Sequence, residues 1–165
     1  MGYNNGVGRQ APSFILPAAD GGEIDLGDYR GDWFPVLVFV PAQSLGVERE
    51  LAGLSSAAGT FWGLRGQLLG ICDASLEETR ALAGRVVGLT TITGTDRSTG
   101  VRGLSFPLLA DDGRVAAAYD VVKRDGGIRA TVVILDRAGK IVWRGDGPGA
   151  LKPSALLDAF RQVVR

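Results

Sequence analysis

PVLVFVP, at residues 35–41, is a valine-rich apolar run between two prolines. Such a run is typical of a central strand that is covered on both faces. Residues 47–64 then show the helical spacing of apolar side chains, and QLLGICD at residues 67–73 predicts a second buried strand. Because two strands joined through one helix lie parallel with a right-handed crossover, these segments predict the centre of an α/β sheet.

The remaining segments add elements to this sheet. Residues 11–26 predict two short strands around a glycine turn, and a capping box at residues 75–78 begins a helix that continues to residue 87. Residues 129–146 predict an antiparallel hairpin, and Pro153 begins a last amphipathic helix. The expected fold class is α/β, with a thioredoxin-like mixed central sheet flanked by helices.

Length and composition indicate an ordinary globular protein. Its 165 residues suit one domain, so residues 1–165 are expected to form a single thioredoxin-like domain with residues 1–10 flexible. Eighteen basic and eighteen acidic residues cancel, and the scattered basic residues argue against a nucleic-acid partner. No apolar stretch approaches the roughly 20 residues that span a bilayer, and no signal peptide is recognisable. We therefore expect a cytoplasmic protein with no membrane partner.

Two residue counts narrow the chemistry further. The chain has no histidine, which excludes Ser-His-Asp and Cys-His catalysis and histidine-ligated zinc or haem. It has one cysteine, Cys72, which excludes an intrachain disulfide and a cysteine zinc cluster. No metal and no other cofactor is therefore expected.

Three longer segments carry a resemblance to a known family. They are GRQAPSFILPAADGGEIDLGDYRG at 8–31, FPLLADDGRVAAAYDV at 106–121 and RATVVILDRAGKIVW at 129–143. With the strand at 35–41, these segments resemble peroxiredoxins of the alkyl hydroperoxide reductase/thiol-specific antioxidant family, which have glycine where this chain has Asp120. The resemblance implies a peroxiredoxin-type fold and a family activity of antioxidant oxidoreductase, as a thiol-dependent peroxidase.

The active-site motif of that family, Pro-x-x-x-Thr-x-x-Cys, is only partly present. Counting from Pro41, the threonine position is Leu45 and the cysteine position is Glu48. The stretch after Pro41 is one residue shorter than in many relatives, so Val47 is the alternative for the cysteine position. Arg129 matches the arginine that the family places beside its thiolate. The remnant pocket is therefore Pro41, Leu45, Glu48 and Arg129, a degenerate active site with no catalytic residue assigned.

Glu48 has three interpretations. An acidic residue in the first turn of a helix is favoured by the helix dipole. Alternatively, Glu48 pairs with Arg129 and imitates the charge of a thiolate, in which case the two groups lie within about 4–6 Å of each other. A catalytic carboxylate is the third interpretation, without a second acid, histidine or metal to complete a mechanism. Arg129, in turn, is either inherited from the family pocket or part of a strand-edge salt bridge.

Cys72 ends an apolar strand and is expected to be buried and slow to react. Alternation places it on the same face as Leu68 and Gly70, and the missing side chain of Gly70 leaves a route for partial access. The alternative is a relocated thiol, because parallel strands end at the edge of a sheet where α/β proteins bind ligands.

The sequence leaves three hypotheses for function. The first, which we favour, is a peroxiredoxin-like binding or regulatory module without ordinary thiol peroxidase activity. The second is a one-Cys thiol-dependent peroxidase that reduces hydroperoxides through Cys72 with an external thiol reductant. The third is a structural subunit that forms a homodimer or pairs with a cysteine-bearing relative. Residues 89–105 are expected to form a flexible insertion, with a partner-binding loop as the alternative.

Overall fold

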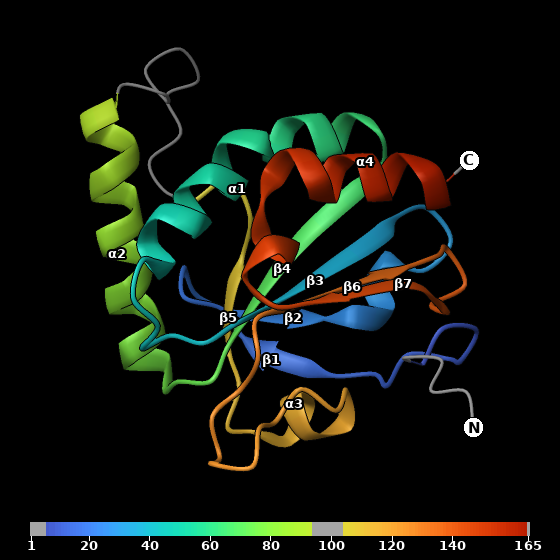
Figure 1. Ribbon diagram of the computed structural model, residues 1–165, viewed down its shortest axis with the longest axis horizontal. Helices are drawn as coiled ribbons and strands as arrows, with labels where there is room; N and C mark the ends of the chain where they lie inside the picture. Colours follow the sequence, from blue (N-terminus) through green and yellow to red (C-terminus); the bar gives the residue numbers. More distant parts are fainter. Residues whose placement is uncertain (1–5, 94–103, 165) are drawn as a thin grey trace.

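The computed structural model describes residues 6–93 and 104–164, and its centre is a five-stranded mixed sheet (Figure 1). The strand order is β5-β4-β3-β6-β7, with bounds β3 Phe34–Val40, β4 Gly66–Cys72, β5 Leu108–Ala110, β6 Thr131–Leu135 and β7 Ile141–Asp146. A separate hairpin consists of β1 Ile15–Pro17 and β2 Glu23–Asp25. The helices are α1 Val47–Gly63, α2 Leu76–Thr93, α3 Arg114–Ala118 and α4 Pro153–Val163, with 3-10 turns η1 Leu26–Tyr29 and η2 Pro148–Leu151.

The sheet has a parallel half and an antiparallel half. β3 pairs in parallel with β4, and β4 with β5, whereas β3–β6 and β6–β7 are antiparallel. The predicted parallel crossover and the predicted hairpin are therefore both present. β5 was not predicted, because three residues are too few to show a periodic pattern.

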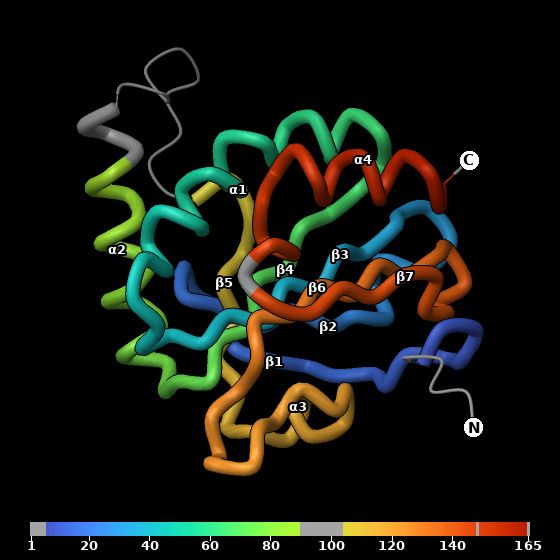
Figure 2. The backbone as a smooth tube through the Cα atoms, viewed as in Figure 1, coloured from blue at the N-terminus to red at the C-terminus, as the bar shows by residue number. Residues whose placement is uncertain are grey.

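Helices and hairpin form layers on opposite faces of the sheet. Figure 2 shows α1 and α4 side by side on one face, and α3 with β1 on the other. Along β3 the side chains alternate between the two layers: Val36, Val38 and Val40 pack toward α1 and α4, while Leu37 and Phe39 pack toward the hairpin and α3. Both faces of β3 are thus buried, as its continuous apolar sequence predicts. No helix in the described part of the chain is long and apolar enough to cross a membrane.

The helix α2 begins where predicted and ends later. The Ser75 N–H donates to Glu78 Oε1 (3.2 Å) and the Glu78 N–H donates to Ser75 Oγ (3.1 Å), which completes the capping box. The helix then continues to Thr93, so the expectation of a loop from residue 89 is wrong for residues 89–93. Residues 94–103 of that predicted insertion lie outside the described residues.

Candidate functional site

The remnant pocket begins in the loop between β3 and α1. The Ala42 N–H donates to Asp73 Oδ1 (2.9 Å), which ties this loop to the end of β4. Gly46 has a φ of 83° and turns the chain into α1. Leu45, at the threonine position of the family motif, is 101% exposed and therefore lines no enclosed site. A leucine at this predicted position supplies no hydroxyl group.

The two candidates for the cysteine position have opposite environments. Val47 is the first residue of α1 and is buried in the core. Glu48 follows it in the first turn, with 30% of its side chain exposed. An apolar side chain therefore points inward and a carboxylate points outward at the start of α1. Neither residue supplies a sulfur nucleophile.

Glu48 forms an ion pair with a residue that the sequence did not suggest. Its Oε1 accepts a hydrogen bond from Nε of Arg85 on α2 over 3.0 Å. A backbone hydrogen bond at Glu48 and the Arg85 guanidinium together lower the pKa of this carboxyl. The predicted pairing of Glu48 with Arg129 is therefore wrong, because the partner of Glu48 is Arg85. Its predicted place at the N-terminal turn of α1 is confirmed.

Arg129 binds a backbone carbonyl. Its Nη2 donates to the carbonyl oxygen of Asp120 over 2.7 Å. The same oxygen accepts Nη2 of Arg144 (2.8 Å), whose Nη1 donates to the carbonyl of Tyr119 (2.6 Å). Asp120 has a φ of 56°, a conformation that is uncommon for a residue with a side chain. The two guanidinium groups thus hold the turn that follows α3.

Cys72 is fully buried on the helix side of the sheet. It packs in the same cluster as Leu68, whereas Ile71 faces the opposite layer, as the predicted alternation requires. Burial, and to a lesser extent the neighbouring Asp73, raises the pKa of the Cys72 thiol to about 12. The expected gap over Gly70 does not exist, because Leu108 and Phe106 occupy that space. The expectation of partial access through Gly70 is therefore wrong.

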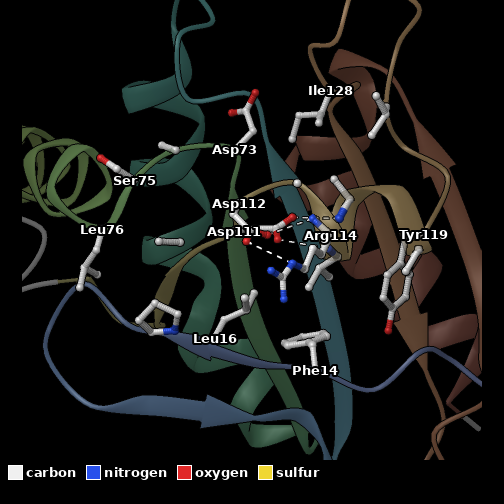
Figure 3. Close-up of a pocket in the computed structure, with 18 of the residues that line it drawn as sticks. Phe14, Leu16, Asp73, Ser75, Leu76, Asp111, Asp112, Arg114, Tyr119 and Ile128 are labelled. Carbon is white, nitrogen blue, oxygen red and sulfur yellow. Dashed lines mark hydrogen bonds and ion pairs between the residues drawn. The ribbon is translucent and has the colours of Figure 1, made fainter.

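A cavity of about 950 Å³ lies on the other face, between β1, the β4–α2 turn and α3 (Figure 3). Its walls include Phe14, Leu16, Asp73, Ser75, Asp111 and Tyr119. Pro41, Leu45, Glu48, Arg129 and Cys72 are not among the lining residues. The structure therefore separates the motif positions from this cavity.

Sequence reasoning missed the residue that shapes this cavity. Asp111 is buried, and its two carboxylate oxygens accept the N–H groups of Val115 (3.1 Å) and Ala116 (2.9 Å). An aspartate three residues before a helical segment is a capping signal that could have revealed this role. Within residues 6–93 and 104–164, no group of three or more Cys, Asp or Glu side chains is arranged to hold a metal ion.

The sequence and the fold both match known proteins. The model of the AhpC/TSA family matches residues 7–144. The chain belongs to the AhpC/TSA family. Among its AhpC/TSA relatives, a Mycobacterium tuberculosis (strain H37Rv) protein named "Putative peroxiredoxin" is 32% identical over 144 residues, which cover 82% of this chain and 81% of that protein. A Clostridium pasteurianum protein, named as lying in the rubredoxin operon, is 29% identical over 74% of this chain and 67% of its own length.

Solved structures confirm the thioredoxin-like fold of this family. Peroxidoxin BcpB from Mycobacterium tuberculosis superposes with a TM-score of 0.74 and 20% identity, covering 96% of this chain and 97% of that one. AhpC from Enterococcus faecalis gives a TM-score of 0.74 at 19% identity, covering 96% and 94% of the two chains. A yeast mitochondrial 1-Cys peroxiredoxin gives a TM-score of 0.75 at 21% identity, covering 94% of this chain and 76% of its own.

Proposed function

We propose that this AhpC/TSA-family protein is a binding or regulatory module that keeps the peroxiredoxin fold without thiol peroxidase activity. The observation that carries the proposal is the burial of Cys72, which is the only cysteine of the chain. Its side chain is buried, and its pKa is raised to about 12. At pH 7 such a thiol is almost entirely protonated.

Peroxide reduction by a thiol needs the thiolate. The sulfur attacks one peroxide oxygen, the O–O bond breaks, and the other oxygen leaves as an alkoxide or hydroxide that takes up a proton, while the cysteine becomes a sulfenic acid. In active sites that perform this step, a helix N-terminus or a nearby cation lowers the pKa of the thiol. Burial and Asp73 act in the opposite direction on Cys72. A one-Cys mechanism through this residue therefore lacks both its nucleophile and the access of its substrate.

The remnant pocket supports the same proposal. A carboxylate at Glu48 cannot form a sulfenic acid, and it is already bound by Arg85. Leu45 is in solvent, and the guanidinium of Arg129 donates to the carbonyl of Asp120. Of the four residues of the remnant pocket, Leu45 is therefore exposed to solvent, and Glu48 and Arg129 are already bound to other groups of the chain.

The test is consumption of hydrogen peroxide and of an alkyl hydroperoxide in the presence of dithiothreitol. Wild-type protein and Cys72→Ser should both give the rate of dithiothreitol alone, while a peroxiredoxin with an intact Pro-x-x-x-Thr-x-x-Cys motif, assayed in parallel, turns over. Turnover by the wild type that is lost in Cys72→Ser would contradict the proposal. Homodimerisation, or pairing with a cysteine-bearing relative, stays a prediction that analytical ultracentrifugation tests directly.

A further inference from the structure

The large cavity forms where β1 and β5 separate. Just after the end of β1, the chain is joined to β5. Ala18 forms an antiparallel bridge with Leu109, and the Ala19 N–H donates to the carbonyl of Leu108 (2.8 Å). One residue beyond β5, Asp111 turns the chain into the cap of α3. Beyond this point β5 no longer flanks β1, and residues of β1 and of the segment after β5 both line the cavity (Figure 3).

The open edge of β1 presents backbone hydrogen-bonding groups. The Leu26 N–H donates to the carbonyl of Phe14, and the Ala18 N–H donates to the carbonyl of Gly22, so these residues of the strand face β2. Because the direction of backbone groups alternates along an antiparallel strand, the N–H and C=O of Ile15 point away from β2. Among the described residues, no backbone hydrogen bond joins either group to a residue outside the strands. Pro12 and Pro17 also line the cavity, so the usable edge is short.

The rim of the cavity combines apolar and acidic side chains. Ile15 is 58% exposed and Val122 is 38% exposed, and both line the cavity. Carboxylates outnumber basic groups among the lining residues of the described chain: Asp73, Glu78, Asp111 and Asp112 against Arg114.

Several of these carboxylates are fixed before any ligand arrives. Asp111 caps α3, Glu78 belongs to the capping box of α2, and Asp73 accepts the N–H of Ala42. Arg114 pairs with Asp112 (3.3 Å) and is largely exposed, so it can move away. A preorganised acidic site loses less entropy when it binds a cation.

We propose that this cavity binds a short, extended peptide segment that carries lysine or arginine side chains. The segment pairs with the edge of β1 at Ile15, places apolar side chains against Ile15 and Val122, and directs a basic side chain toward Asp111 and Asp112. Addition of a strand to an open sheet edge is an established mode of peptide recognition. The inference rests on the proposed function, because it names the class of partner for a binding module.

The probe is the hexapeptide Ac-VKVRVK-NH2, titrated into the full-length protein by isothermal calorimetry at low salt. Two matched peptides are Ac-VEVEVE-NH2, which reverses the charge, and a version of the basic peptide with N-methylated valines, which removes backbone donors. We expect binding of the basic peptide only. Ile15→Pro removes one edge donor and should weaken binding by about fivefold or more, whereas Ile15→Ala, which keeps the N–H, should weaken it less.

Charge variants test the acidic rim. Asp112→Lys should weaken binding by about threefold to tenfold, and Asp158→Lys, on the exposed side of α4 across the sheet, should leave it unchanged. Arg114→Ala should tighten binding, because it removes a competing cation. Circular dichroism and thermal unfolding check that each variant is folded. Should Ile15→Pro fail to fold, the N-methylated peptide tests the backbone pairing on wild-type protein.

Three outcomes would overturn the inference. They are equal binding of the acidic peptide, equal binding of the N-methylated peptide, and a self-association in ultracentrifugation that Ile15→Pro abolishes, which would assign the edge to a second copy of the chain. Peroxide turnover by the same samples would contradict the proposed function while leaving the peptide titration to be judged separately.

Discussion

The carboxylate of Glu48 accepts a 3.0 Å hydrogen bond from Nε of Arg85, so the first turn of α1 is joined to α2 by a charge-assisted contact. Counting from Pro41 predicts the family's cysteine at or beside this residue, and the structure has an interhelical ion pair there. The ion pair therefore links the start of α1 to α2.

Glu48→Gln should lower the free energy of unfolding by about 0.2–1 kcal/mol at pH 7, the usual range for a partly exposed pair. Because the folded-state pKa of Glu48 is lowered, this contribution is present above the unfolded pKa and is lost as pH falls through the folded pKa. Urea unfolding should show a smaller difference from wild type at pH 3 than at pH 7. Arg85→Gln and the double variant complete the cycle.

Glu50→Gln is the matched control. Burial raises the pKa of Glu50, so neutralising this carboxyl should leave stability at pH 7 unchanged or slightly higher. Equal losses for Glu48→Gln and Glu50→Gln would show that the ion pair with Arg85 contributes nothing specific.

Cys72 should react slowly with a thiol reagent such as 5,5′-dithiobis(2-nitrobenzoate) in the native state. Burial raises its pKa to about 12 and shields the sulfur, so labelling requires opening of the structure. The rate at pH 7 should rise by orders of magnitude in denaturing urea, with Cys72→Ser as the blank. Native labelling as fast as that of free cysteine would contradict the burial and revive the thiol enzyme.

Restoring a cysteine at the start of α1 should not restore peroxidase activity. In a Cys72→Ser background, Glu48→Cys places a thiol near Arg85, so it should label readily, yet reduce peroxide no faster than free cysteine. Adding Leu45→Thr should change that rate by less than about twofold, because position 45 points into solvent. Val47→Cys buries its thiol and should label slowly. A gain of about tenfold or more from Leu45→Thr would show a pocket that is intact but lacks its sulfur.

Gly66→Ala should destabilise the protein by about 1–3 kcal/mol, because a Cβ there would lie 2.6 Å from the buried ring of Phe160. Gly59→Ala is the matched control, since nothing lies within 4 Å of its Cβ position and the residue is inside α1. That substitution should stabilise the protein by about 0.5–1 kcal/mol through helix propensity. Thermal unfolding of both variants measures the contrast, and a stable Gly66→Ala would mean that α4 can shift on β4.

Local patterns predicted the framework of the fold. The apolar run at 35–41 predicted a strand buried between two layers, which is β3. The Ser75–Glu78 spacing predicted the start of α2. The partner of Glu48 could not be predicted, because Arg85 is 37 residues away and reaches Glu48 only through the packing of α1 against α2. The cavity could not be predicted either, since it forms where β1 and β5, which are far apart in sequence, separate.

The hydrogen bond from Arg129 to the carbonyl of Asp120 gives this arginine a structural function. This hydrogen bond stabilises a turn whose backbone is in an uncommon conformation. A second arginine, Arg144, donates a hydrogen bond to the same oxygen. Arg129, which lies two residues before β6, therefore has a structural role in this fold that does not depend on a thiolate. The presence of an arginine at this point of the chain is by itself no sign of peroxide turnover.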